Sequence, residues 1–407
     1  QNLIESSLFP DRYEMTLEQL GGGNTTNLLF KLTLVNTRAS ASYSYVLKTY
    51  KEYANSLEPE KLFVLVKNDF PNAPKIYGTI KVQGKGSIGI LEHVESKGNV
   101  GDVYWGELNA LVDEIFQNIE ADHSPLKDKQ EKASAIERYC QESMTMSNEL
   151  AQHIERLHDA LIMGGDEAYS RDDVKSADFL GPYSEKLHDM IASLQEKMES
   201  ASGSAFYNLP KVKAILVDTK DIIEKFKDEF EFEEITVQPV HQDLHMEQIL
   251  YNKNTEHEYY FIDFEGDPQL SYEEKTQKFP MEKDLASFLR SLSYIKFNTF
   301  LGYVAKHIPD DSFEVPEEVL YSIFFRKAAK TQDRNKTLQI LLDVLDTWEK
   351  KLIGTFLGNL DETRVYIPLI NFFTIERVLH EISYETLFRP RKIIVPLLGL
   401  QELLRTY

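Results

Sequence analysis

The sequence lacks the features that define several large classes of protein. It contains one cysteine, Cys140, in 407 residues, which excludes an internal disulfide and fits a reducing cytoplasm. No apolar run approaches the ~20 residues that a membrane-spanning helix needs. Basic residues are outnumbered, 45 against 66 acidic ones, which gives a formal net charge of −21. Because nucleic acids and anionic membranes would repel such a chain, we expect neither as a partner.

The chain also lacks internal repeats and low-complexity tracts, so a solenoid or a fibrous protein is not expected. Its length exceeds what one hydrophobic core usually holds, which predicts two or three lobes. Apolar residues make up 42% and charged residues 27% of the chain, as in an ordinary globular protein. We therefore expect a globular, cytoplasmic protein with more than one lobe.

The first part of the chain is rich in residues that alternate in polarity, which is typical of β-strands. Strands are expected at residues 15–20, 28–35, 42–48, 76–82 and 88–93. A helix that opens at Pro59 interrupts them. We predict a small β-rich N-lobe over residues 1–94.

From Glu95 onward the apolar residues follow the spacing of helices. Apolar stripes run through residues 150–161, 187–198 and 212–226, and the polar segments 122–131 and 164–173 are expected to be loops. A large, mostly helical C-lobe is predicted over residues 95–407. The whole is an α+β chain with the bilobal layout of a protein kinase.

Two short segments, Val240–Asn252 and Phe261–Gly266, interrupt this helical part and carry the most informative side chains. They place Asp243, a carboxamide five residues later (Gln248) and a second acid (Asp263) on a short β-hairpin. Protein kinases use the same spacing of Asp, carboxamide and Asp-Phe-Gly. Phosphoryl transfer needs a carboxylate for the acceptor's hydroxyl proton and oxygen ligands for Mg²⁺. These residues predict an ATP- and Mg²⁺-dependent small-molecule kinase.

In this hypothesis Asp243 is the catalytic base, and the metal is held by Gln248 and Asp263, with Glu265 as a further ligand. Lys48, at the end of the third predicted strand, is expected to bind the α- and β-phosphates of ATP. Glu60 is its predicted partner, with Glu58 second. The remaining predicted nucleotide contacts are Gly22, Gly23, Asn24 and Thr25 in a glycine-rich turn, and Glu92 and Val94 in the hinge between the lobes.

Other interpretations stay open at this point. His241 and His245 flank Asp243 in a pattern that metal sites also use, which would suggest a metal-dependent hydrolase. We expect instead that His241 packs beneath the loop and that His245 lies near the acceptor. Asp284, in the first turn of a helix, is expected to anchor this loop with support from Arg290. A non-catalytic nucleotide-binding module is a further alternative.

A series of motifs spans most of the chain. It comprises Asn24-Thr25, Leu47-Lys48, Phe70-Pro-x-x-Pro74, Gly98-x-x-Gly-Asp102, His241-Gln-Asp-Leu-His-x-x-Gln248, Ile262-Asp-Phe-Glu-Gly-Asp-Pro268, Asp284-Leu-Ala-Ser-Phe-Leu-Arg-Ser-Leu-Ser-Tyr294, Glu376-Arg-Val-Leu-His-Glu-Ile-Ser-Tyr-Glu385, Arg389-Pro390 and Ile394-Val-Pro-Leu-Leu-Gly-Leu400. In this order the motifs resemble those of the bacterial maltokinases, which include kinase domains fused to trehalose synthase. That family has the aminoglycoside phosphotransferase-like kinase fold.

The resemblance implies transfer of the γ-phosphate of ATP to maltose, giving maltose 1-phosphate for α-glucan (glycogen) synthesis. It also implies a functional association with a trehalose synthase, and a sugar-facing helix that carries Arg377, His380 and Tyr384. The family commonly has Lys and Tyr where this chain has Arg377 and His380. Such changes alter hydrogen-bonding geometry and remove a phenol ring, so glucosamine or another sugar is the alternative substrate. A plainer interpretation makes the acids Glu376, Glu381 and Glu385 a solvated helix face.

Overall fold

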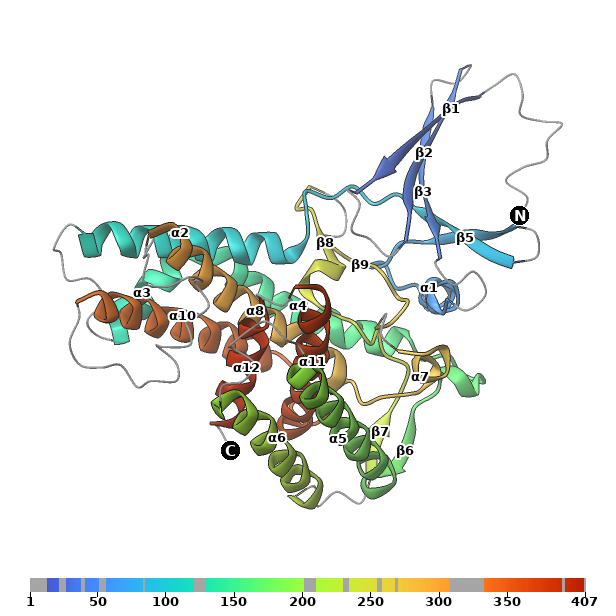
Figure 1. Ribbon diagram of the computed structural model, residues 1–407. Helices are drawn as coiled ribbons and strands as arrows, with labels where there is room; N and C mark the ends of the chain where they lie inside the picture. The colour runs from blue at the N-terminus through green and yellow to red at the C-terminus, as the bar shows by residue number, and fades with distance from the viewer. Residues whose placement is uncertain are drawn as a thin grey trace.

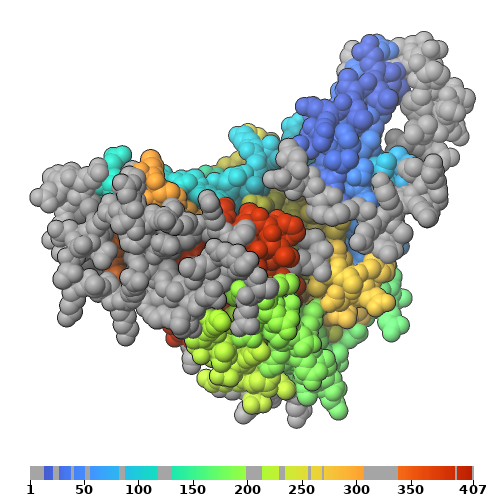
Figure 2. Space-filling model, in the orientation of Figure 1, coloured from blue at the N-terminus to red at the C-terminus, as the bar shows by residue number. Residues whose placement is uncertain are grey.

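The computed structural model describes residues 13–21, 27–37, 41–50, 56–82, 85–120, 129–200, 210–229, 234–254, 258–267, 270–307, 333–389 and 392–405. They form two lobes (Figure 1), a small one built on a β-sheet and a larger one built mainly from helices. In the space-filling view, the strands near the N-terminus project away from the helical body (Figure 2). The predicted α+β, two-lobed architecture is confirmed.

The small lobe contains a five-stranded antiparallel sheet in the order β1-β2-β3-β5-β4. Its strands are β1 (Tyr13–Leu20), β2 (Leu29–Asn36), β3 (Ser42–Thr49), β4 (Ile76–Val82) and β5 (Lys85–Glu92). All five predicted strands are therefore confirmed within a few residues. The sheet ends at Glu92, and the first helix of the large lobe begins at Val100. The functional division at residue 94 stays a prediction.

Helix α1 (Glu58–Lys67) connects β3 to β4 and lies against the small lobe. Pro59 in its first turn needs no hydrogen-bond partner for its nitrogen, and acids in that turn complement the helix dipole. Leu62, Val64 and Leu65 are buried. This amphipathic arrangement fixes which residues of α1 face the rest of the protein.

The large lobe is an assembly of helices. They are α2 (Val100–Glu120), α3 (Lys129–Tyr139), α4 (Gln141–Ala160), α5 (Ser176–Ser200), α6 (Pro210–Glu229), α7 (Tyr272–Thr276), α8 (Glu282–His307), α10 (Asp333–Leu357), α11 (Ile367–Phe388) and α12 (Ile394–Leu404). Two short antiparallel pairs join them: β6 (Asp172–Lys175) with β7 (Glu234–Val237), and β8 (Ile249–Tyr251) with β9 (Tyr259–Phe261). Helices α8 and α11 pack against each other and lie below the β8–β9 hairpin in the view of Figure 1.

The predicted apolar stripes form the core of this lobe. Leu150, Ile154 and Leu157 are fully buried on α4, and α5 buries its stripe except for Met190, which is partly buried. On α6 the predicted Ile215, Leu216 and Phe226 are buried, whereas the predicted Ile222 is only partly buried and its neighbour Ile223 is fully buried. The segment 164–173 is not entirely a loop, because it contains a short 3-10 helix (Glu167–Tyr169) and the start of β6. In the described part of the chain, no helix combines the length and apolar character needed to cross a membrane.

Candidate active site

The β8–β9 hairpin brings two of the predicted metal ligands together. Its strands are antiparallel, with Ile249 opposite Phe261, so the start of β8 and the end of β9 lie at the same end. There the side-chain amide of Gln248 donates to Oδ2 of Asp263 over 3.1 Å. The φ of Asp263 is 65°, a left-handed conformation that is uncommon outside glycine and often occurs at functional sites.

Lys48 reaches this pair from the small lobe. Its ammonium lies 2.6 Å from Oδ1 of Asp263, 2.7 Å from Oε1 of Glu265 and 2.9 Å from Oε2 of Glu58. The predicted ion pair with Glu60 is wrong, since Glu58 takes that place and Glu60 is exposed. The side chains of residues two apart on a helix differ in direction by about 200° around the helix axis, so only one of these acids can face Lys48.

This end of the site carries an excess of negative charge, because three carboxylates contact one ammonium. Burial lowers the pKa of Lys48, but the carboxylates outweigh that effect and hold it well above its usual value. Burial also raises the pKa of Glu265, and the nearby charges of Glu58 and Asp263 add to the rise while Lys48 opposes it. The carboxylates of Asp263 and Glu265, with the amide oxygen of Gln248 once its side chain is rotated, are hard oxygen donors. They fit a divalent cation such as Mg²⁺.

A cavity of about 720 Å³ between the lobes is lined by Lys48, Gln248 and Asp263 of this cluster. Its apolar part is formed by the sheet face and by the β8–β9 region, and includes Leu20, Leu29, Val46, Leu91, Leu250 and Ile262. The connecting segment between the lobes, with the predicted residues Glu92 and Val94, also lines it. A chamber of this size with an apolar part and a few charged groups in its wall is typical of a small-molecule site.

The predicted glycine-rich turn lies mainly outside the described residues. This applies to Gly22, Gly23, Asn24 and Thr25, whose contact with phosphates stays a prediction. Gly21 is described, and its φ of 77° suits a tight turn that favours glycine.

The loop before β8 is held by Asp284 at the start of α8. Its two carboxylate oxygens each accept a backbone N–H, from His241 and from Gln242, over 2.7 Å. His158 contacts the same carboxylate over 2.9 Å. Burial raises the pKa of Asp284, but these hydrogen bonds outweigh it and leave the pKa below its usual value. The predicted anchor is confirmed, whereas Arg290, its predicted support, is paired with Glu381 instead.

His241 has the structural position that the sequence predicted. It is fully buried, its Nε2 donates to the carbonyl oxygen of Ile262 over 2.9 Å, and its ring lies 4.7 Å from that of Phe264. Burial is the main cause of its lowered pKa, which favours the neutral form of the ring. A histidine whose Nε2 is occupied in this way links the Asp243 loop to the Asp263 loop.

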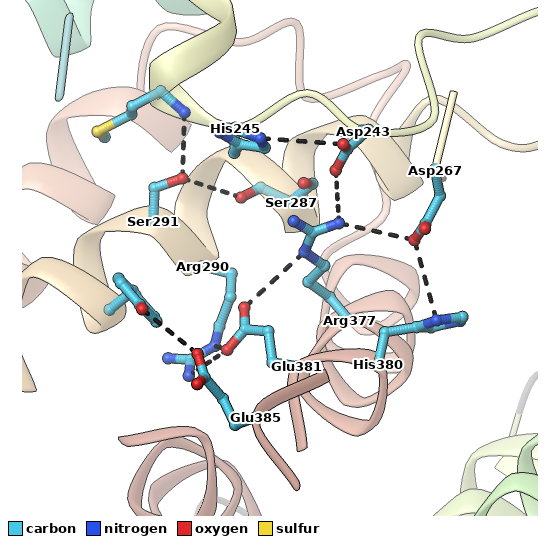
Figure 3. Close-up of polar contacts among 12 residues, drawn as sticks. Asp243, His245, Asp267, Ser287, Arg290, Ser291, Arg377, His380, Glu381 and Glu385 are labelled. Atoms are coloured by element: carbon cyan, nitrogen blue, oxygen red, sulfur yellow. Dashed lines mark hydrogen bonds and ion pairs between the residues drawn. The ribbon is translucent and has the colours of Figure 1, made fainter. Parts of the chain in front are cut away.

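Asp243 itself is paired with Arg377, which extends from α11 (Figure 3). Nη1 of Arg377 donates to Oδ1 of Asp243 over 2.6 Å. Burial raises the pKa of Asp243 to about 6, although the charge of Arg377 opposes the rise. His245 lies 3.9 Å from Oδ2 of the same carboxylate. Its side chain also lines the cavity, which places the Asp243 loop beside the Lys48 end of the site.

His380 and Tyr384, the other two residues of α11 that were predicted to face the sugar, have different surroundings from Arg377, and their contact with a sugar stays a prediction. His380 is buried, 3.9 Å from Asp267 and 3.7 Å from Glu376. Tyr384 is 41% exposed, and its ring contacts Phe388 at 4.8 Å between centres. Figure 3 shows Arg377 as the α11 side chain that points at Asp243.

The acids of α11 are not a solvated face. Lys283 donates to Glu376 over 2.5 Å, Arg290 donates to Glu381 over 2.8 Å, and Arg389 donates to Glu385 over 2.7 Å. Glu376 and Glu385 are buried. The basic partners make this face of α11 part of the protein interior.

Three residues near the site were not predicted. Asp267 lies 3.8 Å from Arg377, and Glu381 lies 3.8 Å from the same guanidinium. The spacing of four residues between Arg377 and Glu381 was a usable signal. Lys61 on α1 donates to the carbonyl oxygen of Val240 over 2.9 Å. No local pattern marks a lysine that reaches another lobe.

Comparison with known proteins supports the fold. No family model matches the chain. A structure of glucosamine kinase in complex with glucosamine, ADP and inorganic phosphate is similar, with a TM-score of 0.57 and 15% identity over 96% of this chain and 82% of that one. A second glucosamine kinase structure has a TM-score of 0.55 and 15% identity over 98% of this chain and 82% of that one. The structure of an aminoglycoside phosphotransferase has a TM-score of 0.44 and 10% identity over 96% of this chain and 94% of that one. The chain therefore shares the two-lobed fold of these glucosamine kinase structures, with a β-rich small lobe and a mostly helical large lobe.

Proposed function

We propose that this chain is an ATP- and Mg²⁺-dependent sugar kinase of the cytoplasm. The observation that supports it most is the meeting of Lys48 and Asp263, from different lobes, in the wall of a 720 Å³ cavity. Gln248 adjoins this pair, and the loop of Asp243 lies alongside. The same arrangement of base, carboxamide, acid and lysine serves phosphoryl transfer in kinases.

In this proposal the adenine ring occupies the apolar part of the cavity, and Lys48 exchanges part of its carboxylate contact for a phosphate. Asp263, Gln248 and Glu265 would hold Mg²⁺, which neutralises phosphate charge when bound. Asp243 orients the acceptor hydroxyl and takes its proton at the carboxylate. Catalysis then rests on positioning and on charge neutralisation.

The proposed acceptor is maltose, phosphorylated at its anomeric hydroxyl to give maltose 1-phosphate, with a trehalose synthase as a functional associate. The motifs of the maltokinases support this choice. Glucosamine is the second candidate, because the similar structures include a glucosamine kinase with glucosamine bound and because this chain departs from maltokinases at Arg377 and His380.

Two other functions receive less support. A non-catalytic nucleotide-binding module would not need Asp243 together with Lys48 and Asp263. For a metal-dependent hydrolase, His241 and His245 would have to share an ion with further ligands, but the group of described residues close enough to do so includes neither histidine. Within the described residues, the acidic cluster close enough to share an ion is Asp346, Glu349 and Glu402, and these surround the ammonium of Lys296.

The test is a panel of sugars with ATP and Mg²⁺, including maltose, glucosamine and glucose, with NMR identification of the phosphorylated carbon. Maltose 1-phosphate is the expected product. Phosphorylation of glucosamine alone would reject maltose and retain the sugar kinase. If ATP binds but no sugar, amine or other alcohol is phosphorylated, the kinase proposal fails.

A further inference from the structure

A second cavity lies on the opposite side of α1 from Lys48. It has a volume of about 540 Å³ and is formed by three segments: the first turns of α1, the strand β4 and residues 163–169 of the large lobe. Its walls include the side chains of Phe63 and Tyr169 and the methionine Met163. Phe63 is 51% exposed, so its ring is an apolar surface of the cavity that is open to solvent. The cavity is therefore an open apolar groove that bridges the two lobes.

One border of the groove is an unpaired sheet edge. Strand β4 is the last in the order β1-β2-β3-β5-β4, and within the described residues it pairs only with β5. Residues 76–79 of β4 line the groove. The free N–H and C=O groups of an edge strand are able to pair with an added extended chain.

The charged residues that line the groove indicate which kind of extended chain would bind there. Glu60 and Asp166 line it, and none of the described lining residues is basic. The pKa of Tyr169, which also lines the groove, is raised mainly by burial. The negative charges of Glu60 and Asp166 raise this pKa further. Lys67 lies over the ring of Phe63 at 4.9 Å but does not line the groove. An occupant with basic groups on either side of an apolar side chain complements this arrangement.

We propose that this groove is a docking site for an extended peptide segment of a partner protein, added as a strand to β4. An apolar side chain of the peptide enters between α1 and residues 163–169, and its basic neighbours on the same face approach Glu60 and Asp166. Alternate residues of a strand share one face, so the recognised pattern is basic-x-apolar-x-basic.

Helix α1 connects this groove to the site between the lobes. On its inner side Glu58 contacts Lys48 and accepts the backbone N–H of Phe264 over 3.2 Å, and Lys61 contacts the carbonyl of Val240. Glu60 and Phe63 lie on the other side of the helix, about 140–200° around from Glu58. A docked peptide therefore controls the position of the helix that orients Lys48. This regulatory part rests on the proposed kinase function, whereas peptide binding does not.

The experiment uses the full chain and a labelled peptide, acetyl-Thr-Lys-Thr-Leu-Thr-Lys-Thr-amide, with binding measured by fluorescence anisotropy. Glu60→Lys is expected to weaken binding about tenfold, and Phe63→Ser about fivefold. The matched controls are Glu18→Lys and Leu17→Ser, exposed residues on the other edge strand of the same sheet, which should change binding less than about twofold.

Two further peptides test the mode of binding. Replacing both lysines by glutamate, or both central threonines by proline, should abolish binding, because proline removes backbone donors. Hydrogen exchange should show slower amide exchange in residues 76–80 when the peptide binds. Equal binding to the Glu60→Lys and Glu18→Lys variants, or protection of β1 instead of β4, would overturn the proposal.

Other outcomes separate the occupants and the two proposals. If the protein alone forms a dimer that Phe63→Ser disrupts, the occupant is a second copy and not a peptide. If the peptide binds as described while no phosphoryl transfer is found with any acceptor, the kinase proposal fails and the docking site stands. If transfer is found but the peptide does not bind, the docking proposal alone fails.

Discussion

An ion pair of 2.6 Å joins Nη1 of Arg377 on α11 to Oδ1 of Asp243 in the loop before β8. The two residues are far apart in the sequence, and α11 also contributes Glu381 and His380 to the surroundings of this pair (Figure 3). A guanidinium favours the ionised form of the carboxylate that it contacts. In the proposed kinase, the Asp243 carboxylate must therefore bind both Arg377 and the acceptor hydroxyl before it takes the proton of that hydroxyl.

The first prediction concerns the base itself. Asp243→Asn should fold normally and lower kcat by about 10²–10⁴-fold, because the amide cannot accept the hydroxyl proton. The measurement is the rate of sugar phosphate formation with the best acceptor. Asp218→Asn, at an exposed site on α6, is the matched control and should leave the rate unchanged. Near-normal turnover in Asp243→Asn would remove Asp243 from the mechanism.

The second prediction is a pH dependence. Since burial raises the pKa of Asp243 to about 6, kcat/KM should decrease as the pH falls through this value and the carboxylate becomes protonated. Arg377 opposes that rise, so Arg377→Gln should move the acidic limb of the profile to higher pH. Arg171→Gln, which removes a surface ion pair with Asp159, should leave the limb in place. An unchanged limb in Arg377→Gln would contradict the coupling.

The third prediction separates two acids of α1. Glu58 contacts Lys48 and the backbone of Phe264, whereas Glu60 faces away. A hydrogen bond to a charged group contributes ~1.5–3 kcal/mol, so Glu58→Gln should reduce kcat/KM for ATP about tenfold or more. Glu60→Gln is the matched control. Measured without any added peptide, it should have little effect on kcat/KM for ATP. Equal effects of the two changes would mean that Glu58 does not orient Lys48.

The fourth prediction concerns the metal. Chelation with EDTA should abolish transfer, and excess Mg²⁺ should restore it. Gln248→Ala removes an oxygen ligand and should raise the Mg²⁺ concentration for half-maximal activity about 10–100-fold. Gln117→Ala, exposed on α2, should not. If the Mg²⁺ requirement of Gln248→Ala matches that of the unaltered protein, Gln248 is not a ligand.

The fifth prediction is a stability change. Asp284→Ala should reduce the free energy of unfolding by about 3–5 kcal/mol, because two backbone N–H groups and His158 lose a buried charged partner. The folded pKa of Asp284 is lowered, so its contribution is complete above the unfolded value of about 3.9 and is lost as the pH falls through the folded value. Urea unfolding at several pH values measures both effects, with exposed Asp189→Ala as control. A loss below ~1 kcal/mol would contradict the anchoring role.

Local sequence was sufficient for much of this protein. The alternation of side chains predicted the strands of the small lobe, and helical spacing predicted the buried stripes of α4 and α5. The spacing of Gln248 and Asp263 around two short strands also predicted their contact, because an antiparallel hairpin brings its two ends together. These features depend on neighbours in the chain, which a sequence displays directly.

Only the tertiary structure decided which distant partners meet. The choice of Glu58 over Glu60 depends on how α1 is rotated about its axis, and the contact of Arg377 with Asp243 depends on how α11 packs on α8. Both are set by the burial of whole helix faces, to which hundreds of small contacts contribute. A sequence lists the charged residues, but the packing of the apolar ones determines which charges come within reach of one another.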